Sequence, residues 1–126
     1  MSRLGCVCGH SIPDHTDNLS YKGYIIRDKH FEDLHIALDD MAAYSVAERD
    51  GKGQEWLIAR IEEAYAQRQP NIAHVISTIW LRFFVKRKRD IYQCECCGRI
   101  WIQGENNHFF SFVPEKSDSQ GVLDIK

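Results

Sequence analysis

The stretch that decides the fold is Tyr92-Gln-Cys-Glu-Cys-Cys-Gly-Arg-Ile-Trp101, in the C-terminal third of the chain. Its Cys94 and Cys97 stand in C-x-x-C spacing, and Gly98 follows directly. Residues that favour β-structure flank the cysteines on both sides. Two thiolates presented from one tight turn can bind the same metal ion, and the glycine permits the positive φ that such a turn requires. The stretch therefore predicts one half of a tetrahedral zinc site.

The N-terminal segment Cys6-Val-Cys-Gly-His10 supplies the other half of the predicted site. The chain has five cysteines, and the only ones outside the first stretch are in this segment. Four thiolates fill a tetrahedral shell and leave no position at which a water could be activated, so the zinc is expected to be structural. We predict one zinc ion per chain, bound by Cys6, Cys8, Cys94 and Cys97.

Two other residues are alternative candidates for the ligand set. Cys96 can replace Cys94 or Cys97, and His10 can replace Cys8. Disulfides or unmodified core thiols are alternatives, but neither explains why a glycine follows each pair. The odd cysteine count and the lack of an apolar signal segment after Met1 favour reduced thiolates in a cytoplasmic protein.

The length and composition predict one domain. With 126 residues, of which 44% are hydrophobic, the chain can bury a substantial core. The net charge of −2 gives no overall attraction to nucleic acid or membrane. No apolar run approaches the roughly 18 residues that span a bilayer. We divide the domain into an N-terminal knuckle and strand (1–27), a helical insertion (28–90), a C-terminal knuckle and hairpin (91–113) and a tail (114–126).

Apolar residues at spacings of three and four predict three helices in the insertion. The first begins near Asp28 and ends before Gly51-Lys-Gly53, the second covers about 54–67, and the third covers about 72–88. The third is the most apolar. Short strands are expected at 24–26, 91–94, 99–103 and 109–113, with a turn-rich connection at 11–22 and an edge segment at 122–125.

The two cysteine segments resemble the knuckles of zinc-ribbon and rubredoxin-like proteins. The resemblance covers Cys6-Val-Cys-Gly9 and Cys94-Glu-Cys-Cys-Gly98. Together with the helices, it implies an α+β fold: a small antiparallel zinc-ribbon sheet with a three-helix bundle inserted between the two cysteine knuckles. The stretch 92–101, with Phe-Ser-Phe-Val-Pro-Glu at 110–115, also resembles small bacterial proteins, and some proteins of that type are immunity partners of secreted toxins.

No catalytic motif stands out in the sequence. His30 and His35 are five positions apart, which places them about 140° apart around a helix, so they do not form a zinc-protease pair. A phosphate-binding loop, a nucleophile elbow and a dinucleotide fingerprint are also missing from the sequence. We predict that the chain is not an enzyme.

Acidic residues on the first helix indicate a protein partner. The segment Asp28–Asp50 has seven acidic residues and only two basic ones, Lys29 and Arg49. Such a face suits a basic protein, for example a toxin domain, although a solvated helix face explains each carboxylate equally well. The main prediction is a bacterial immunity or adaptor protein that binds its partner through Glu32, Asp33, Asp39, Asp40 and Glu48.

A basic cluster at the end of the third helix supports an alternative, a nucleic-acid-binding zinc ribbon. Tyr92, Trp101 and Phe110 would offer stacking surfaces to bases. Cations at a helix C-terminus are also favoured by the helix dipole, so a solvated cap is the simpler explanation. The residues of this alternative are Arg82, Lys86, Arg87, Lys88 and Arg89.

Overall fold

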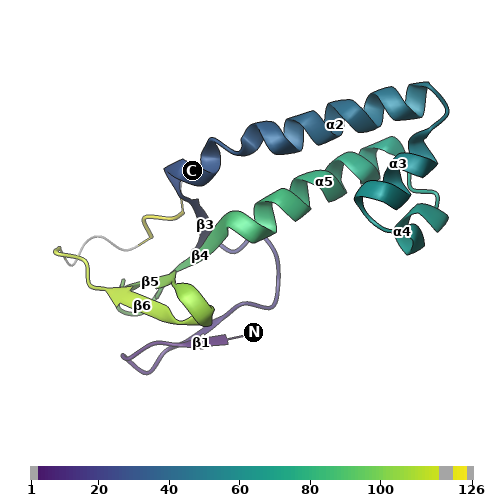
Figure 1. The fold of residues 1–126 in the computed structure, drawn as a ribbon. Helices are drawn as coiled ribbons and strands as arrows, with labels where there is room; N and C mark the ends of the chain where they lie inside the picture. The colour runs from purple at the N-terminus through teal and green to yellow at the C-terminus, as the bar shows by residue number, and fades with distance from the viewer. Residues whose placement is uncertain (1–2, 117–120, 125–126) are drawn as a thin grey trace. The chain divides into compact units, whose positions relative to one another are not determined.

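The computed structural model describes residues 3–116 and 121–124. Within these residues the chain mixes helices with two antiparallel sheets (Figure 1). It forms two compact units. The first, which we call the sheet unit, combines residues 1–25 and 88–126, and the second, the helical unit, comprises residues 26–87.

The sheet unit contains a two-stranded and a four-stranded sheet. The strands of the four-stranded sheet lie in the order β3-β4-β5-β6, where β4-β5 and β5-β6 are antiparallel neighbours. The strands are β1 (Arg3–Gly5), β2 (Ser11–Pro13), β3 (Lys22–Ile26), β4 (Lys88–Gln93), β5 (Ile100–Gln103) and β6 (Phe109–Phe112), and a 3₁₀ turn, η1 (Glu105–Asn107), precedes β6.

The pairing of β1 with β2 was not predicted, because Ser11–Pro13 was assigned to the turn-rich connection. This strand has one apolar residue, Ile12, which gives no alternating pattern to recognise. Ile12 is only 1% exposed and joins the core of the sheet unit. Tyr92 and Trp101 are direct cross-strand partners on β4 and β5, and both are buried in the same core.

The helical unit contains α1 (Asp28–Phe31), α2 (Leu34–Arg49), α3 (Gly53–Arg60), α4 (Glu63–Gln67) and α5 (Ile72–Arg87). The third predicted helix forms as one element, whereas the first and second are each divided. Glu32 and Asp33 lie between α1 and α2 and belong to neither helix. Glu62 is fully extended and separates α3 from α4, and no glycine or proline marks that break in the sequence.

The predicted end of the first helix is confirmed by the backbone. Gly51 has φ of 74°, and its N–H donates to Glu48 O at 3.2 Å. The N–H of Lys52 donates to Ala47 O at 2.7 Å, which completes a Schellman motif. Only a residue that tolerates the left-handed region fits this position without cost.

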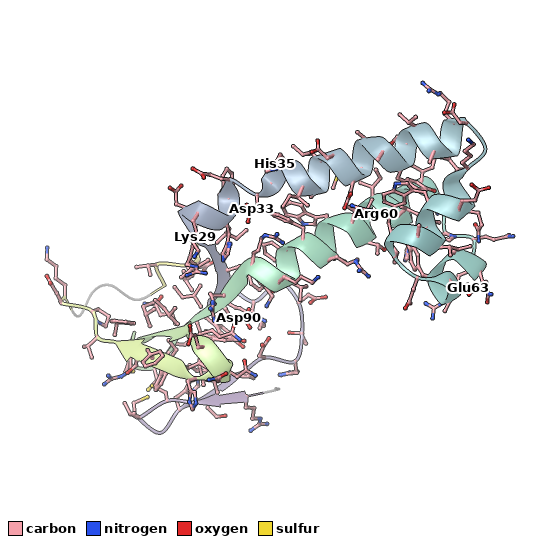
Figure 2. All side chains as sticks on the ribbon, in the orientation of Figure 1. Lys29, Asp33, His35, Arg60, Glu63 and Asp90 are labelled. Carbon is pink, nitrogen blue, oxygen red and sulfur yellow. The ribbon has the colours of Figure 1, made fainter. Side chains whose placement is uncertain are left out.

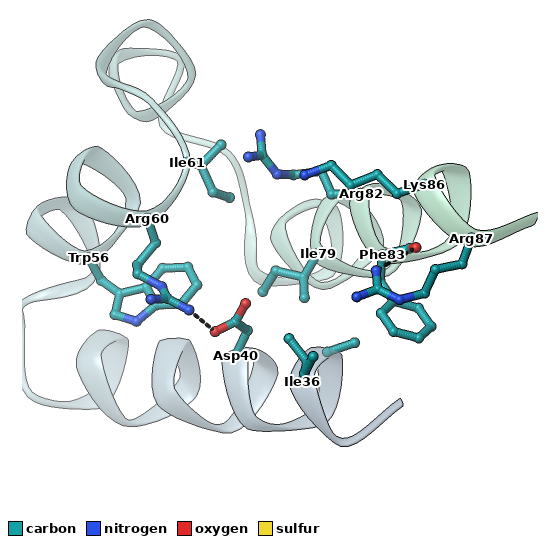
Figure 3. Close-up of a pocket in the computed structure, with 11 residues that line it drawn as sticks. Ile36, Asp40, Trp56, Arg60, Ile61, Ile79, Arg82, Phe83, Lys86 and Arg87 are labelled. Atoms are coloured by element: carbon teal, nitrogen blue, oxygen red, sulfur yellow. Dashed lines mark hydrogen bonds and ion pairs between the residues drawn. The ribbon is translucent and has the colours of Figure 1, made fainter. Parts of the chain in front are cut away.

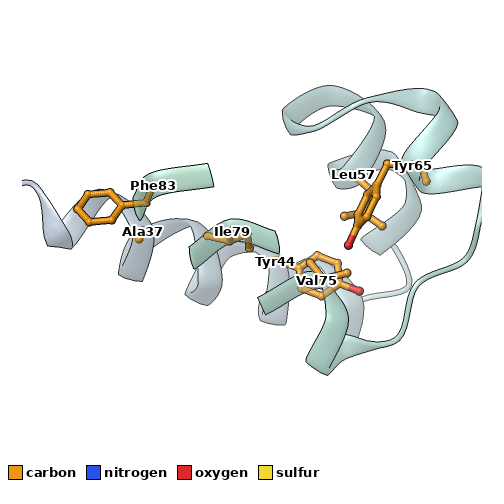
Figure 4. Close-up of a cluster of buried hydrophobic side chains, with 8 residues drawn as sticks. Ala37, Tyr44, Leu57, Tyr65, Val75, Ile79 and Phe83 are labelled. Carbon is orange, nitrogen blue, oxygen red and sulfur yellow. The ribbon is translucent and has the colours of Figure 1, made fainter. Parts of the chain in front are cut away.

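The core of the helical unit lies where α2 packs against α5 and α3 (Figure 4). Val75, Ile79 and Phe83 are four residues apart and form the buried face of α5. The hydroxyl of Tyr65 lies 2.9 Å from Thr78 Oγ1, so its polar end is satisfied inside the core. The other core residues are Ala37, Tyr44, Leu57 and Ala66.

Residues 121–124 form a turn, and the predicted edge segment at 122–125 extends to Ile125, which lies outside the described residues. In the described residues, the Val122 N–H donates to Gln93 Oε1 at 2.9 Å, and Asp124 N–H donates to Gly121 O at 3.0 Å. Residues 117–120, 125 and 126 of the predicted tail, and residues 1–2 of the predicted N-terminal segment, lie outside the described residues.

Candidate metal centre

The C-terminal cysteine segment is the turn of a β-hairpin. Gln93 on β4 faces Ile100 on β5, and the six residues between them form the turn. The Cys94 N–H donates to Arg99 O at 2.8 Å, and the Gly98 N–H donates to Cys94 O at 2.8 Å. Gly98 has φ of 77°, as its place after the cysteines predicted.

The N-terminal cysteine segment has the same organisation with one residue fewer. Gly5 on β1 faces Ser11 on β2. The Cys6 N–H donates to His10 O at 2.9 Å, and the Gly9 N–H donates to Cys6 O at 3.0 Å. Gly9 has φ of 97°. Because this turn is one residue shorter, C-x-C spacing presents two cysteines from it, as C-x-x-C spacing does in the other hairpin.

The two turns bring four sulfurs together, as predicted. Cys6 Sγ lies 3.6 Å from Cys97 Sγ, and Cys8 Sγ lies 3.6 Å from Cys94 Sγ. All four sulfurs lie within 4.8 Å of one another, so the cluster can hold a metal ion. These separations are far longer than a disulfide bond of about 2.05 Å. They match the roughly 3.8 Å between thiolates that stand about 2.3 Å from a central zinc ion.

Both alternative ligands lie outside this cluster. Cys96 is exposed and is not a member of the four-sulfur group. His10 contributes its carbonyl oxygen to the turn, while its Nε2 is buried without a hydrogen-bond partner in the described part of the chain.

Burial and local hydrogen bonds set the protonation of the two buried thiols. Burial raises the pKa of Cys94 to about 12. Burial also acts to raise the pKa of Cys6, but the Cys8 backbone N–H and the Trp101 side chain favour its thiolate more strongly, so the pKa is lowered to about 6. In the metal-free protein Cys94 therefore keeps its proton at neutral pH, and binding of a divalent metal would displace that proton.

The surroundings of the sulfurs fit a negatively charged metal–thiolate centre. Cys6, Cys94 and Trp101 belong to one buried cluster. The Trp101 indole N–H is buried next to Cys6, whose thiolate it favours. A divalent ion with four thiolates carries a net charge of −2, which a nearby indole N–H stabilises.

Gln93 supports the C-terminal turn, a role that the sequence did not indicate. It is only 2% exposed. Its side-chain amide donates to Gly98 O at 3.1 Å, and its backbone N–H donates to Tyr21 O at 2.8 Å. A buried glutamine between β-formers reads as an ordinary strand residue, so only the fold shows that it holds the turn.

A second polar cluster stabilises the sheet unit. The Lys22 ammonium lies 3.0 and 2.9 Å from the two carboxylate oxygens of Asp14, and the Tyr92 hydroxyl donates to Asp14 Oδ2. Burial disfavours the charged form of Asp14, but these two donors outweigh it and lower the pKa of Asp14. Burial likewise disfavours the charged Lys22, yet Asp14 raises its pKa.

The Asp14 cluster predicts an acid-sensitive contribution to stability. Because the pKa of Asp14 is lower in the folded state, its contribution is present above the unfolded value near 3.9 and is lost as pH falls through the folded pKa. Asp14→Asn should cost about 2 kcal/mol at pH 7, and its difference from the wild type should shrink below about pH 4. Urea denaturation of both proteins between pH 7 and pH 2.5 measures this difference.

Asp17→Asn is the matched control, because Asp17 is exposed in the same connection. The control should follow the wild type at every pH. A difference between Asp14→Asn and the wild type that persists undiminished at the lowest pH would contradict the prediction.

Three of the five predicted partner-binding carboxylates have partners within the helical unit. Asp33 Oδ2 lies 3.5 Å from Arg87 Nε, Asp40 lies 2.5 Å from Arg60, and Glu48 accepts a 3.3 Å hydrogen bond from Tyr44. Figure 2 labels Asp33 and Arg60. The two remaining residues, Glu32 and Asp39, are exposed.

The predicted basic cluster is divided between the two units, because α5 ends at Arg87 and β4 begins at Lys88. Lys88 pairs with Asp90 at 2.6 Å, and Arg89 donates to Gly104 O at 2.7 Å. Of the predicted stacking residues, Tyr92 and Trp101 are buried and Phe110 is 59% exposed.

The other three cations of the cluster, Arg82, Lys86 and Arg87, line a cleft of about 220 Å³ in the helical unit (Figure 3). Arg60 also lines it, together with the apolar residues Ile79 and Phe83. The sequence did not predict this cleft, because Arg60 comes from a different helix.

His30 and His35, which were not predicted to form a site, make local contacts in the helical unit. His30 Nε2 lies 2.7 Å from Arg27 Nη2, and His35 Nδ1 lies 2.9 Å from Glu32 O.

None of the helices in the described part of the chain is both long and apolar enough to cross a membrane.

Comparison with known proteins gives a family. No curated protein and no solved structure matches the chain. One family model, described as a domain of unknown function (DUF8617), matches residues 2–116. This match includes both cysteine turns and the whole helical unit. The chain therefore belongs to the DUF8617 family.

Proposed function

We propose that this chain is a non-catalytic protein-binding module whose sheet unit is a zinc ribbon held by one structural zinc ion. The observation that carries the proposal is the four-sulfur cluster, in which all donors lie within 4.8 Å. A complete thiolate shell leaves no coordination site for a substrate or a water, so the metal would serve the fold rather than a reaction.

The choice of zinc rests on the donor set. Tetrahedral four-sulfur sites in proteins hold zinc or iron. Metal analysis of protein purified under reducing conditions should give one zinc per chain, and native mass spectrometry should show the same stoichiometry. A colourless protein distinguishes zinc from a rubredoxin-like iron centre. A fully folded chain that carries no metal would refute the proposal.

The binding role is assigned to the helical unit, which we propose to be a three-helix bundle inserted into the ribbon. The concrete form is a bacterial immunity or adaptor protein, acting in the cytoplasm, that covers a basic partner such as a toxin domain. Among the predicted carboxylates, Glu32 and Asp39 support this role best, because they are exposed and acidic residues accelerate association with a basic surface.

A charge-reversal pull-down tests the acidic surface. The double variant Glu32→Lys/Asp39→Lys should lose a partner that the wild type retains from lysate of the native host. Glu63→Lys, an exposed acid on α4, is the control and should retain it. A partner that both variants retain equally would remove the acidic face from the proposal.

The alternative function, nucleic-acid binding, is favoured by one observation: Arg82 and Lys86 line the same cleft as Arg60 and Arg87. Binding to single-stranded nucleic acid that weakens steeply with salt, and is lost in Arg82→Glu/Lys86→Glu, would support it. The absence of binding at low salt would exclude it.

A further inference from the structure

The cleft in the helical unit has an apolar lining as well as its four cations. It is formed by residues of α2, α3 and α5 and by Ile61, all of which belong to the helical unit (Figure 3). Ile79 and Phe83 are each 6% exposed, whereas Ile36 is 42% exposed, so the cleft has a buried part and opens to solvent. The apolar part of the lining consists of Ile36, Ala37, Trp56, Ile61, Ile79 and Phe83.

Two of the four cations are held by partners inside the helical unit. Arg60 pairs with Asp40 at 2.5 Å, and a dashed line marks this contact in Figure 3. Arg87 Nε lies 3.5 Å from Asp33 Oδ2. The Arg87 guanidinium also stands 4.2 Å from the centre of the Phe83 ring, which adds a cation–π contact. The charges of these two arginines are therefore balanced by the protein itself.

The other two cations, Arg82 and Lys86, carry charges that no acid in the described part of the chain balances. Both are exposed, and neither has a hydrogen bond or an ion pair with a described residue. Among the described residues that line the cleft, the only acid is Asp40, which is already paired. Arg82 and Lys86 are four positions apart on α5, so their side chains start about 6 Å apart on one side of the helix. They can therefore bind the same anionic group.

The anion that balances these two charges is best supplied by a phosphate monoester. Such a group carries a charge of about −1.5 to −2 at neutral pH on one compact set of oxygens. Arginine binds phosphate with two parallel hydrogen bonds, and lysine adds a point charge. A single carboxylate would balance only one of the two cations. A dicarboxylate would place its second charge against the apolar lining, and burying a charge there costs free energy.

We propose that this cleft binds a small molecule in which a phosphate monoester is attached to an aromatic ring. The phosphate lies against Arg82 and Lys86, and the ring lies against the apolar lining beside Trp56. Trp56 is half-buried and its ring centroid is 5.4 Å from that of Tyr44, so it forms a fixed aromatic wall. The volume of about 220 Å³ is below the roughly 300–1,000 Å³ of sites for drug-sized ligands, which limits the ligand to a small one. This site goes beyond the proposed function, which assigns binding to exposed acids.

A nuclear magnetic resonance titration of the isotope-labelled full chain with phenyl phosphate tests the proposal. The titration is done near neutral pH in about 150 mM salt, which screens non-specific attraction between exposed charges. We expect saturable shifts that include the Trp56 indole N–H, with a dissociation constant below about 1 mM. Inorganic phosphate lacks the ring, and methyl phenyl phosphate carries only one negative charge. Each of these should bind at least about tenfold more weakly than phenyl phosphate.

Matched variants separate the cleft from the rest of the helical unit. Arg82→Gln and Lys86→Gln should each raise the dissociation constant of phenyl phosphate at least about tenfold, because each removes a charged partner of the phosphate. Arg68→Gln is their control, since Arg68 is exposed in the same unit but does not line the cleft. Ile36→Ala should weaken binding at least about threefold, because it removes part of the apolar lining. Ile58 is similarly exposed and lies outside the cleft, so Ile58→Ala should bind like the wild type.

Several outcomes would overturn the proposal. One is the absence of saturable shifts up to about 10 mM phenyl phosphate, and another is equal affinity for phenyl phosphate and inorganic phosphate. Equal weakening by Arg82→Gln and Arg68→Gln would also overturn it. A single-stranded oligonucleotide that binds where phenyl phosphate does not would replace it with the nucleic-acid alternative.

The variants and the readout keep this test separate from the proposed function. Arg82 and Lys86 are exposed, so both variants should fold, and if circular dichroism shows that one does not, the other decides. Neither the metal content nor the charge-reversal pull-down enters the titration. The failure of this inference and the failure of the proposed function are therefore distinguishable.

Discussion

Replacing Cys97 with serine is expected to abolish metal binding and to unfold the sheet unit. Cys97 Sγ lies 3.6 Å from Cys6 Sγ, and the two residues are 91 positions apart in the chain. A structural zinc contributes on the order of 10 kcal/mol to the folded state, and the sheet unit is too small to replace that contribution with its own core. Metal analysis and near-ultraviolet circular dichroism of the purified variant measure both effects.

Cys96→Ser is the control for this experiment. It removes the neighbouring thiol, which is exposed and lies outside the four-sulfur group. This variant should keep one metal ion per chain and wild-type stability within about 0.5 kcal/mol, as is usual for an exposed site. The opposite result, in which Cys96→Ser loses the metal and Cys97→Ser keeps it, would transfer the ligand role to Cys96.

The second large effect is expected in the helical unit. Leu57 is 2% exposed and packs in the core that α2, α3 and α5 share. Leu57→Ala should lower the free energy of unfolding of this unit by about 3 kcal/mol, since it removes buried methyl groups and leaves a cavity. Urea denaturation followed by circular dichroism at the helical wavelength of 222 nm gives the value.

Ile58→Ala tests whether the effect comes from burial. Ile58 is the next residue of α3 and is 47% exposed. Its truncation should cost less than about 1 kcal/mol. Equal losses for the two variants would show that α3 does not present Leu57 to the core.

Prediction from sequence succeeded where one local pattern sufficed. Glycine after each cysteine pair predicted the positive φ of Gly9 and Gly98, and the cysteine spacing predicted the group of four sulfurs. The apolar spacing located α5, and Gly51-Lys-Gly53 located the end of α2. The residues that carry each signal lie within a few positions of one another. The two cysteine pairs are the exception, since Cys6 and Cys97 are 91 positions apart, and they were joined because the sequence has no other cysteines to complete the site.

Prediction failed where a contact between distant residues determines the structure. The extended Glu62 divides the second helix although the surrounding residues favour helix, and Gln54 Nε2 donates across the break to Ala66 O at 2.5 Å. The acidic residues of α2 looked like one surface, but Asp40 pairs with Arg60, twenty positions away. Periodicity contains no information about such partners.

The division of the sheet unit into two chain segments has a consequence for biosynthesis. Residues 26–87 are continuous, so every residue of the helical core is available before Lys88 leaves the ribosome. The metal centre is different, because Cys6 and Cys8 are made before residues 26–87, whereas Cys94 and Cys97 are made after them. The first two thiols therefore wait without their full ligand set until the whole helical unit has been translated.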